Sequence, residues 1–233
     1  MTLEEPLRQN AIHESGHAVV GFDTGLRFLD GGIWVLADPL SEGRPVGAVE
    51  FFHPDQSPGE WIAALLAGPM YERLSPKGGD NVVAQLIAAL NDSRNTAYAI
   101  HRWLERRRLT ADLPLLEMVF DSATGHMRDW TEMGKHLDSP EWKPRFEFHR
   151  QFFDSLVCQE ADTPTPENGE VNAISLLRWF AVQTRQIVEK QRSVIEALAT
   201  ELLTEKRLNG DRYVMSGPDL ESFLTAHQTR EQR

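Results

Sequence analysis

Hydrophobic residues recur at helical spacing over most of the chain, and this pattern predicts a mainly helical protein. The first such segment spans residues 3–22, and a second spans residues 57–74. The longest spans residues 172–207, where hydrophobic side chains return every three or four positions, as in a helix that packs along another helix. A last short helix is predicted over residues 216–224.

Local signals set the expected ends of these helices. Ser57 and Glu60 form a capping-box pair around Pro58, which suits a first helical position, so the second helix is predicted to begin there. Pro69 is expected to kink or end that helix, because proline lacks the N–H that a helix interior uses. The polar residues 91–95 are expected to interrupt the helical pattern on either side of them.

Two short segments have the pattern of strands. Residues 33–37 and 46–52 are rich in β-branched and aromatic side chains, and turn-forming residues separate them. They predict a hairpin or a small sheet. The expected fold class is therefore mainly α with a small β-sheet or hairpin, in a single domain that spans residues 1–233.

Composition and charge narrow the classes of function. The chain has 24 basic and 35 acidic residues, and its net charge of −11 argues against binding to nucleic-acid phosphates. A single cysteine, Cys158, excludes an internal disulfide. No apolar run is long enough to span a bilayer, and the amino terminus does not resemble a signal peptide. These features predict a cytoplasmic protein without membrane contact.

The strongest chemical signal is the run His13-Glu14-Ser15-Gly16-His17. On a helix, residues four positions apart lie on one face, so His13 and His17 can direct two imidazoles at one ion. Two imidazoles and a carboxylate suit zinc and leave a position open for water, and Glu14 can take a proton from that water. The alternative is a buried helix whose histidines form hydrogen bonds with their neighbours.

This helix resembles the peptidase domain of the FtsH family of zinc metalloproteases. The segment "AIHESGHAVVG" is similar to the family's HExxH helix, "IAALLAGPMYERL" to its "LAGRAAEE" helix, and the residues from 188 to 224 to its carboxy-terminal helices. The resemblance covers residues 10–90 and 172–226, and residues 105–170 form an unmatched insertion. It implies a zincin-like helical peptidase domain.

The resemblance also implies an aspartate as the third metal ligand. In the family this aspartate follows a loop at the head of the next helix, and Asp80 in "GGDNVVAQL" matches it best. Asp92 is the alternative, because the family's aspartate often follows an asparagine, as Asp92 does. Glu72 is a further alternative, since a carboxylate on the second helix serves as ligand in other zinc peptidases.

The expected function is a zinc metalloendopeptidase that hydrolyses peptides or unfolded proteins through a metal-activated water, with Glu14 as the catalytic base. Residues 46–52 are a candidate edge strand that binds an extended substrate through main-chain hydrogen bonds, or alternatively a strand that only packs on the helices. The chain has no GxxxxGK[ST] loop, so folded substrates would require a separate unfoldase. Members of the family assemble as rings, so the resemblance is compatible with a homo-oligomer. The alternative function is a non-catalytic, zinc-stabilised module for protein interaction.

Overall fold

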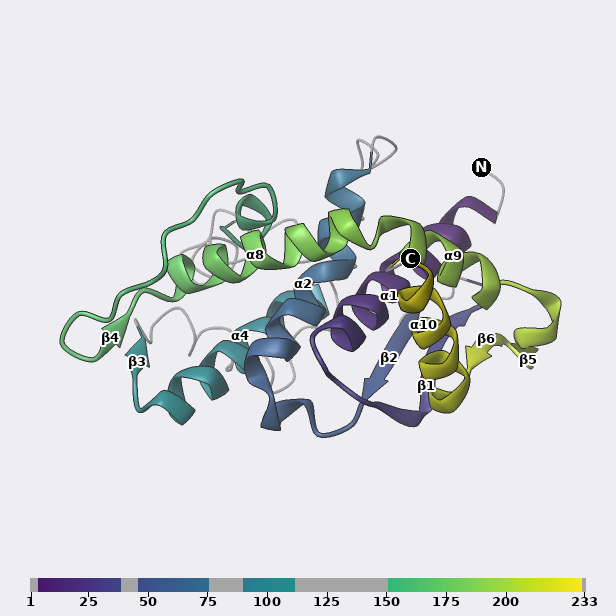
Figure 1. Cartoon of the computed structure of the whole chain (residues 1–233), viewed down its shortest axis with the longest axis horizontal. Coiled ribbons are helices and arrows are strands. Elements are labelled where there is room, and N and C mark those ends of the chain that lie inside the picture. The colour runs from purple at the N-terminus through teal and green to yellow at the C-terminus, as the bar shows by residue number, and fades with distance from the viewer. Residues whose placement is uncertain (1–3, 39–45, 76–89, 112–150, 232–233) are drawn as a thin grey trace, which may run out of the picture.

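The computed structural model describes residues 4–38, 46–75, 90–111 and 151–231 of the chain. These residues form a mainly helical protein with a small antiparallel sheet, as the sequence pattern predicted (Figure 1). The helices are α1 (Glu4–Asp23), α2 (Pro58–Leu74), α4 (Leu90–Arg107), α8 (Ala173–Lys190), α9 (Arg192–Leu202) and α10 (Gly217–Glu231), with 3-10 turns η1 (Pro54–Gln56) and η4 (Glu205–Arg207). The strands are β1 (Phe28–Leu36), β2 (Gly47–Phe51), β3 (Thr110–Ala111), β4 (Glu170–Val171), β5 (Leu208–Asn209) and β6 (Arg212–Met215).

The four-stranded sheet has the order β2-β1-β6-β5, and all its neighbours are antiparallel. The predicted hairpin of β1 and β2 is confirmed, and it leaves β2 at an edge of the sheet. In Figure 1 this sheet lies beside α1 and α10, whereas the short parallel pair of β3 and β4 lies at the opposite end of the molecule.

Helix α2 forms the centre of the core. Every residue from Ile62 to Tyr71 is buried, and α1, α4 and α8 pack around this stretch. A helix that is covered on all sides can be apolar all round, as the sequence of α2 is. Of the two effects expected of Pro69, a kink or an end of the helix, the end does not occur there, because α2 continues to Leu74, the last residue of the predicted segment. Packing against three neighbouring helices outweighs the one hydrogen bond that proline removes.

Three further expectations for the helices are corrected. The Ser57 side chain makes no capping hydrogen bond at the start of α2. Residues 91–95 do not interrupt a helix but belong to α4, where Asp92 is buried. The long helix expected over 172–207 is divided at Gln191, whose buried side chain donates a hydrogen bond to Asp23 Oδ1 over 3.0 Å and ties this joint to α1.

Among the described helices, none combines the length and the apolar composition that crossing a membrane requires. Residues 76–89, which include Asp80, and most of the unmatched insertion lie outside the described residues. The single-domain organisation therefore stays a prediction.

Candidate metal centre

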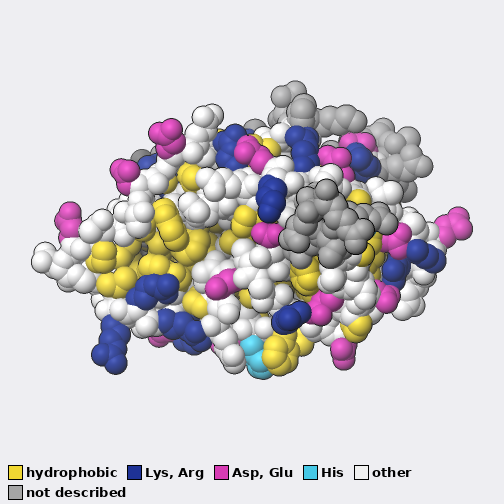
Figure 2. Space-filling view, viewed as in Figure 1, with side chains coloured by type: hydrophobic (Ala, Val, Ile, Leu, Met, Phe, Trp, Pro, Cys, Tyr) yellow, Lys and Arg dark blue, Asp and Glu magenta, His cyan; other side chains and the backbone are white. Residues whose placement is uncertain are grey.

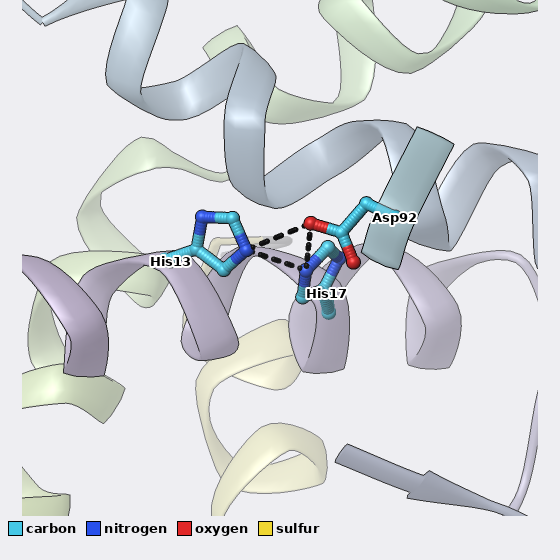
Figure 3. Close-up of side chains that lie close together, drawn as sticks. All are labelled: His13, His17 and Asp92. Carbon is cyan, nitrogen blue, oxygen red and sulfur yellow. Dashed lines mark hydrogen bonds and ion pairs between the residues drawn. The ribbon is translucent and has the colours of Figure 1, made fainter. Parts of the chain in front are cut away.

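Helix α1 places the two motif histidines on the side that faces α2. The Nε2 atoms of His13 and His17 lie 3.0 Å apart, and their rings meet edge to face at an interplanar angle of 82°. Both residues are buried, with 7% and 6% of their surface exposed. The four-residue spacing thus brings two ring nitrogens together, as the sequence predicted (Figure 3).

Helix α4 supplies a carboxylate to the same point. Asp92 Oδ2 lies 3.0 Å from His13 Nε2 and 3.5 Å from His17 Nε2. Figure 3 shows the Asp92 side chain reaching toward both rings. Among the described residues, His13, His17 and Asp92 form the group that could hold a metal ion. The described part of the chain therefore favours Asp92 as the third ligand, while Asp80 lies outside it.

Each histidine ring has a hydrogen-bond acceptor on its other side. His13 Nδ1 donates to Glu72 Oε1 over 3.1 Å, and His17 Nδ1 donates to the Ala64 carbonyl over 2.7 Å. These acceptors fix the proton of each neutral ring on Nδ1 and leave the lone pair on Nε2. Glu72, expected as an alternative ligand, contacts the other nitrogen of His13, where it would orient that ring as a carboxylate behind a metal-binding histidine does.

The resulting arrangement fits a zinc ion. The two Nε2 atoms and a carboxylate oxygen face one another in a buried space, where protons on the rings or a metal ion between the three atoms would relieve their repulsion. In tetrahedral zinc coordination with bonds near 2.0 Å, neighbouring ligand atoms lie about 3.3 Å apart. The three separations found here are 3.0, 3.0 and 3.5 Å. Two imidazoles and one carboxylate are also a ligand set that catalytic zinc sites use.

Gly68 of α2 keeps this space free of side-chain atoms. A Cβ atom at Gly68 would lie 2.7 Å from His17 Nε2 and 2.9 Å from His13 Cδ2. Contacts this short require both rings to move. A glycine at this position therefore allows α2 to approach the two rings while their Nε2 atoms remain together.

We expect Gly68→Ala to weaken zinc binding at least about tenfold, because the added methyl group displaces both rings from their common point. Competition with a chromophoric chelator would measure the change. Gly59→Ala is the matched control in the same helix, since a Cβ there would lie at an ordinary 3.7 Å from its neighbours. Equal zinc affinity for Gly68→Ala and wild type would contradict the proposed position of the ion.

The charges of the cluster shift its proton affinities. Burial by itself lowers the pKa of His13, but the carboxylates of Glu72 and Asp92 outweigh it and raise that pKa well above its ordinary 6.5. Burial would raise the pKa of Asp92, but His17 and His13 outweigh it and lower that pKa below its ordinary 3.8. Protonated His13 contributes stability to the metal-free fold. This contribution is fully present below pH 6.5 and is lost as the pH rises through the raised pKa of His13. Ionised Asp92 also contributes stability to the metal-free fold. This contribution is present above pH 3.8 and is lost as the pH falls through the lowered pKa of Asp92.

Because the pKa values of both His13 and His17 are raised, zinc that binds their Nε2 atoms must compete with protons. We expect zinc affinity to rise with pH, by about tenfold per pH unit for each proton that zinc displaces. Calorimetric titration at about pH 7, in two buffers of different ionisation enthalpy, would count the protons released. Release of at least about one proton per zinc is expected, and release of none would show that the cluster is already deprotonated.

Glu14 lies beside the three candidate ligands and is itself buried, with 8% of its surface exposed. Its side chain lies against the start of β2, where a Cβ on Gly47 would be 2.7 Å from Glu14 Oε1. Burial raises the pKa of Glu14 above its ordinary value, although His17 and His13 act in the opposite direction. A carboxylate with a raised pKa is a better proton acceptor at neutral pH than an exposed one.

Sequence reasoning named Glu72 but missed two other supporting features of this site, the Ala64 carbonyl and Gly68. Nothing in the helical pattern of α2 marks the Ala64 carbonyl as the acceptor for His17, because any residue offers a backbone carbonyl. Gly68 carried a weak signal, as a glycine inside an otherwise apolar helix usually has a packing or functional reason.

Comparison of the chain with protein-family models, with curated proteins and with solved structures gave no match. The geometry of the described residues is therefore the basis for assigning a function.

Proposed function

We propose that the chain is a metal-dependent hydrolase, and within that class a zinc metallopeptidase that cleaves peptides or unfolded protein segments. The observation that carries the proposal is the convergence of His13 Nε2, His17 Nε2 and Asp92 Oδ2 beside the buried carboxylate of Glu14. The resemblance of this helix to the FtsH family's zincin-like peptidase domain supports the same class.

The roles of the side chains follow from their positions. His13, His17 and Asp92 would hold zinc, which when bound supplies a Lewis acid that lowers the pKa of water toward neutrality. Glu14 takes a proton from the attacking water and passes it to the leaving amine. Glu72 and the Ala64 carbonyl keep the histidine rings in place during this transfer.

Strand β2 offers a place for an extended substrate. Leu36 N–H donates to the Val46 carbonyl, and Phe52 N–H donates to the Arg27 carbonyl. In an antiparallel pair the backbone groups of every second residue point to the partner strand, so the even-numbered residues of this segment point theirs to β1. Gly47 and Val49 then present their backbone groups to the edge of the sheet, where no described strand pairs with them. Gly47 also lies against Glu14, so a peptide bound along this edge would pass the proton acceptor.

The burial of the site favours a second candidate. The side chains of His13, His17 and Asp92 are 9%, 7% and 12% exposed, and a covered zinc ion is typical of structural sites. On this basis the chain would be a zinc-stabilised module for protein interaction. Glu14 supports the hydrolase instead, because a structural site does not need an additional carboxylate beside the ligands.

Hydrolysis of an unfolded protein tests the proposal. We expect the purified chain to bind about one zinc ion and to cut casein, to lose this activity when a chelator removes the metal, and to regain it when zinc is restored. Bound zinc without cleavage of casein or of a diverse peptide library would support the interaction module. A cytoplasmic location, a separate unfoldase partner and a homo-oligomer remain parts of this proposal.

A further inference from the structure

A second site lies at the amino-terminal end of α2, between α4 and α8. It is a cavity of about 580 Å³ whose walls include Trp103, Trp179 and Phe180, a volume within the range of ligand sites in proteins. The Phe180 ring lies edge to face with both tryptophans, at centroid distances of 6.1 Å and 4.9 Å. Figure 2 shows hydrophobic side chains gathered on the face where Figure 1 places α8 and α4.

This cavity is separate from the candidate metal centre. Gly59 and Ala63 of α2 line the cavity, whereas Gly68 lies against the histidines, so the two sites are at least five helical positions apart, about 7.5 Å at a rise of 1.5 Å per residue. Nine helical positions also turn the chain by about 900°, which places the two glycines on opposite faces of α2. A ligand in the cavity would therefore not contact the metal ligands.

Two arginines give the cavity a positive border. The Arg107 guanidinium lies over the Trp103 ring at 3.8 Å from its centroid, and Arg106 donates a hydrogen bond to the Gln56 carbonyl. Within the described part of the chain, no carboxylate forms an ion pair with either guanidinium, and Glu60 is the acidic residue that lines the cavity. In a chain of net charge −11, this border is a local reversal of sign.

We propose that this cavity binds an acidic peptide segment of a protein substrate, one that carries a leucine or aromatic side chain between carboxylates. The apolar side chain packs on Trp179 and Phe180, and the carboxylates form charge-assisted hydrogen bonds with Arg106 and Arg107. The cavity would hold one segment of a substrate while another segment of the same substrate is cleaved beside Glu14. The identification of the bound segment as part of a substrate rests on the proposed function, whereas the binding of an acidic peptide does not.

Binding can be measured without catalysis by using metal-free protein and the change in tryptophan fluorescence. The probe is a short peptide with a central Leu-Phe pair flanked on both sides by Asp and Glu, and its neutral twin carries Asn and Gln at the flanking positions. We expect the acidic peptide to bind at least about tenfold more tightly than the neutral twin, and this difference to shrink as salt is added.

Two sets of variants locate the site. Arg106→Gln together with Arg107→Gln should weaken binding of the acidic peptide at least about tenfold, whereas Arg108→Gln, in the same basic run but outside the cavity, should leave it unchanged. Trp179→Leu should weaken both peptides, because it removes part of the aromatic wall. Circular dichroism would show that each variant keeps its helical content.

Several outcomes would overturn the proposal: no binding of the acidic peptide, equal binding of its neutral twin, or an unchanged affinity in the double arginine variant. Binding of laurate without binding of the peptide would assign the cavity to fatty carboxylates instead. Because the metal-free protein is used, a chain that proves unable to hold zinc or cleave casein would still give a clear binding result. Peptide binding in such a chain would support the site and reject only the peptidase.

Discussion

Glu14→Gln is expected to reduce hydrolysis of casein by about 10²–10⁴-fold while the variant keeps its zinc. The substituted side chain has nearly the same shape but cannot accept a proton. Burial raises the pKa of Glu14, which matches its proton affinity more closely to a transfer near neutral pH. Initial rates of peptide release and the zinc content of the same sample would be measured together.

Glu5→Gln is the matched control for this change. It makes the same substitution in the same helix, at an exposed position two turns before the histidines, and should leave both activity and zinc unchanged. Full activity in Glu14→Gln would place the proton acceptor elsewhere. A wild-type chain that holds zinc but shows no hydrolysis would instead favour the interaction module.

The motif helix could be predicted closely from the sequence, because its information is local. Spacing of four positions fixes the common face of His13 and His17, and the observed bounds of α1 agree with the expected helix. The same local logic gave the hairpin of β1 and β2. The two-residue turn Gly210-Asp211, which joins β5 to β6, is a local hairpin signal of the same kind.

The third ligand was harder to predict because it depends on contacts between distant segments. The polar residues 91–95 were expected to break a helix, since polar residues in an apolar pattern usually mark a loop. In the structure they belong to α4, and Asp92 is buried because it faces the histidines of α1. Residues that seem to violate a helical pattern are often those that serve a functional site.

The bounds of α2, Pro58–Leu74, agree with the predicted segment 57–74, but two of its local signals acted differently from expectation. The capping box at Ser57 and Pro69 are signals of an isolated helix, whereas α2 is surrounded by α1, α4 and α8. Tertiary packing then stabilises the helix without a side-chain cap and across the proline. The division of the long helix at Gln191 likewise depends on a contact with Asp23, 168 positions earlier in the chain, which no helical period can reveal.

Asp92→Asn is expected to weaken zinc binding at least about 100-fold, a larger loss than changes to outer-shell partners usually produce. Asparagine keeps the size of the side chain but removes the negative charge that attracts the ion. The charge loss matters here because the cluster is buried, where electrostatic interactions are poorly screened. Competition with a chelator of known affinity would give the ratio of dissociation constants.

Asp80→Asn provides the comparison that decides between the two aspartates. If Asp92 is the third ligand, Asp80→Asn should change zinc affinity less than about twofold, because the coordinating atoms are untouched. The opposite pattern, with zinc lost in Asp80→Asn and kept in Asp92→Asn, would assign the metal to Asp80. Asp92 would then be a hydrogen-bond partner of His13, and the 3.0 Å contact between them would orient the ring rather than complete the metal site.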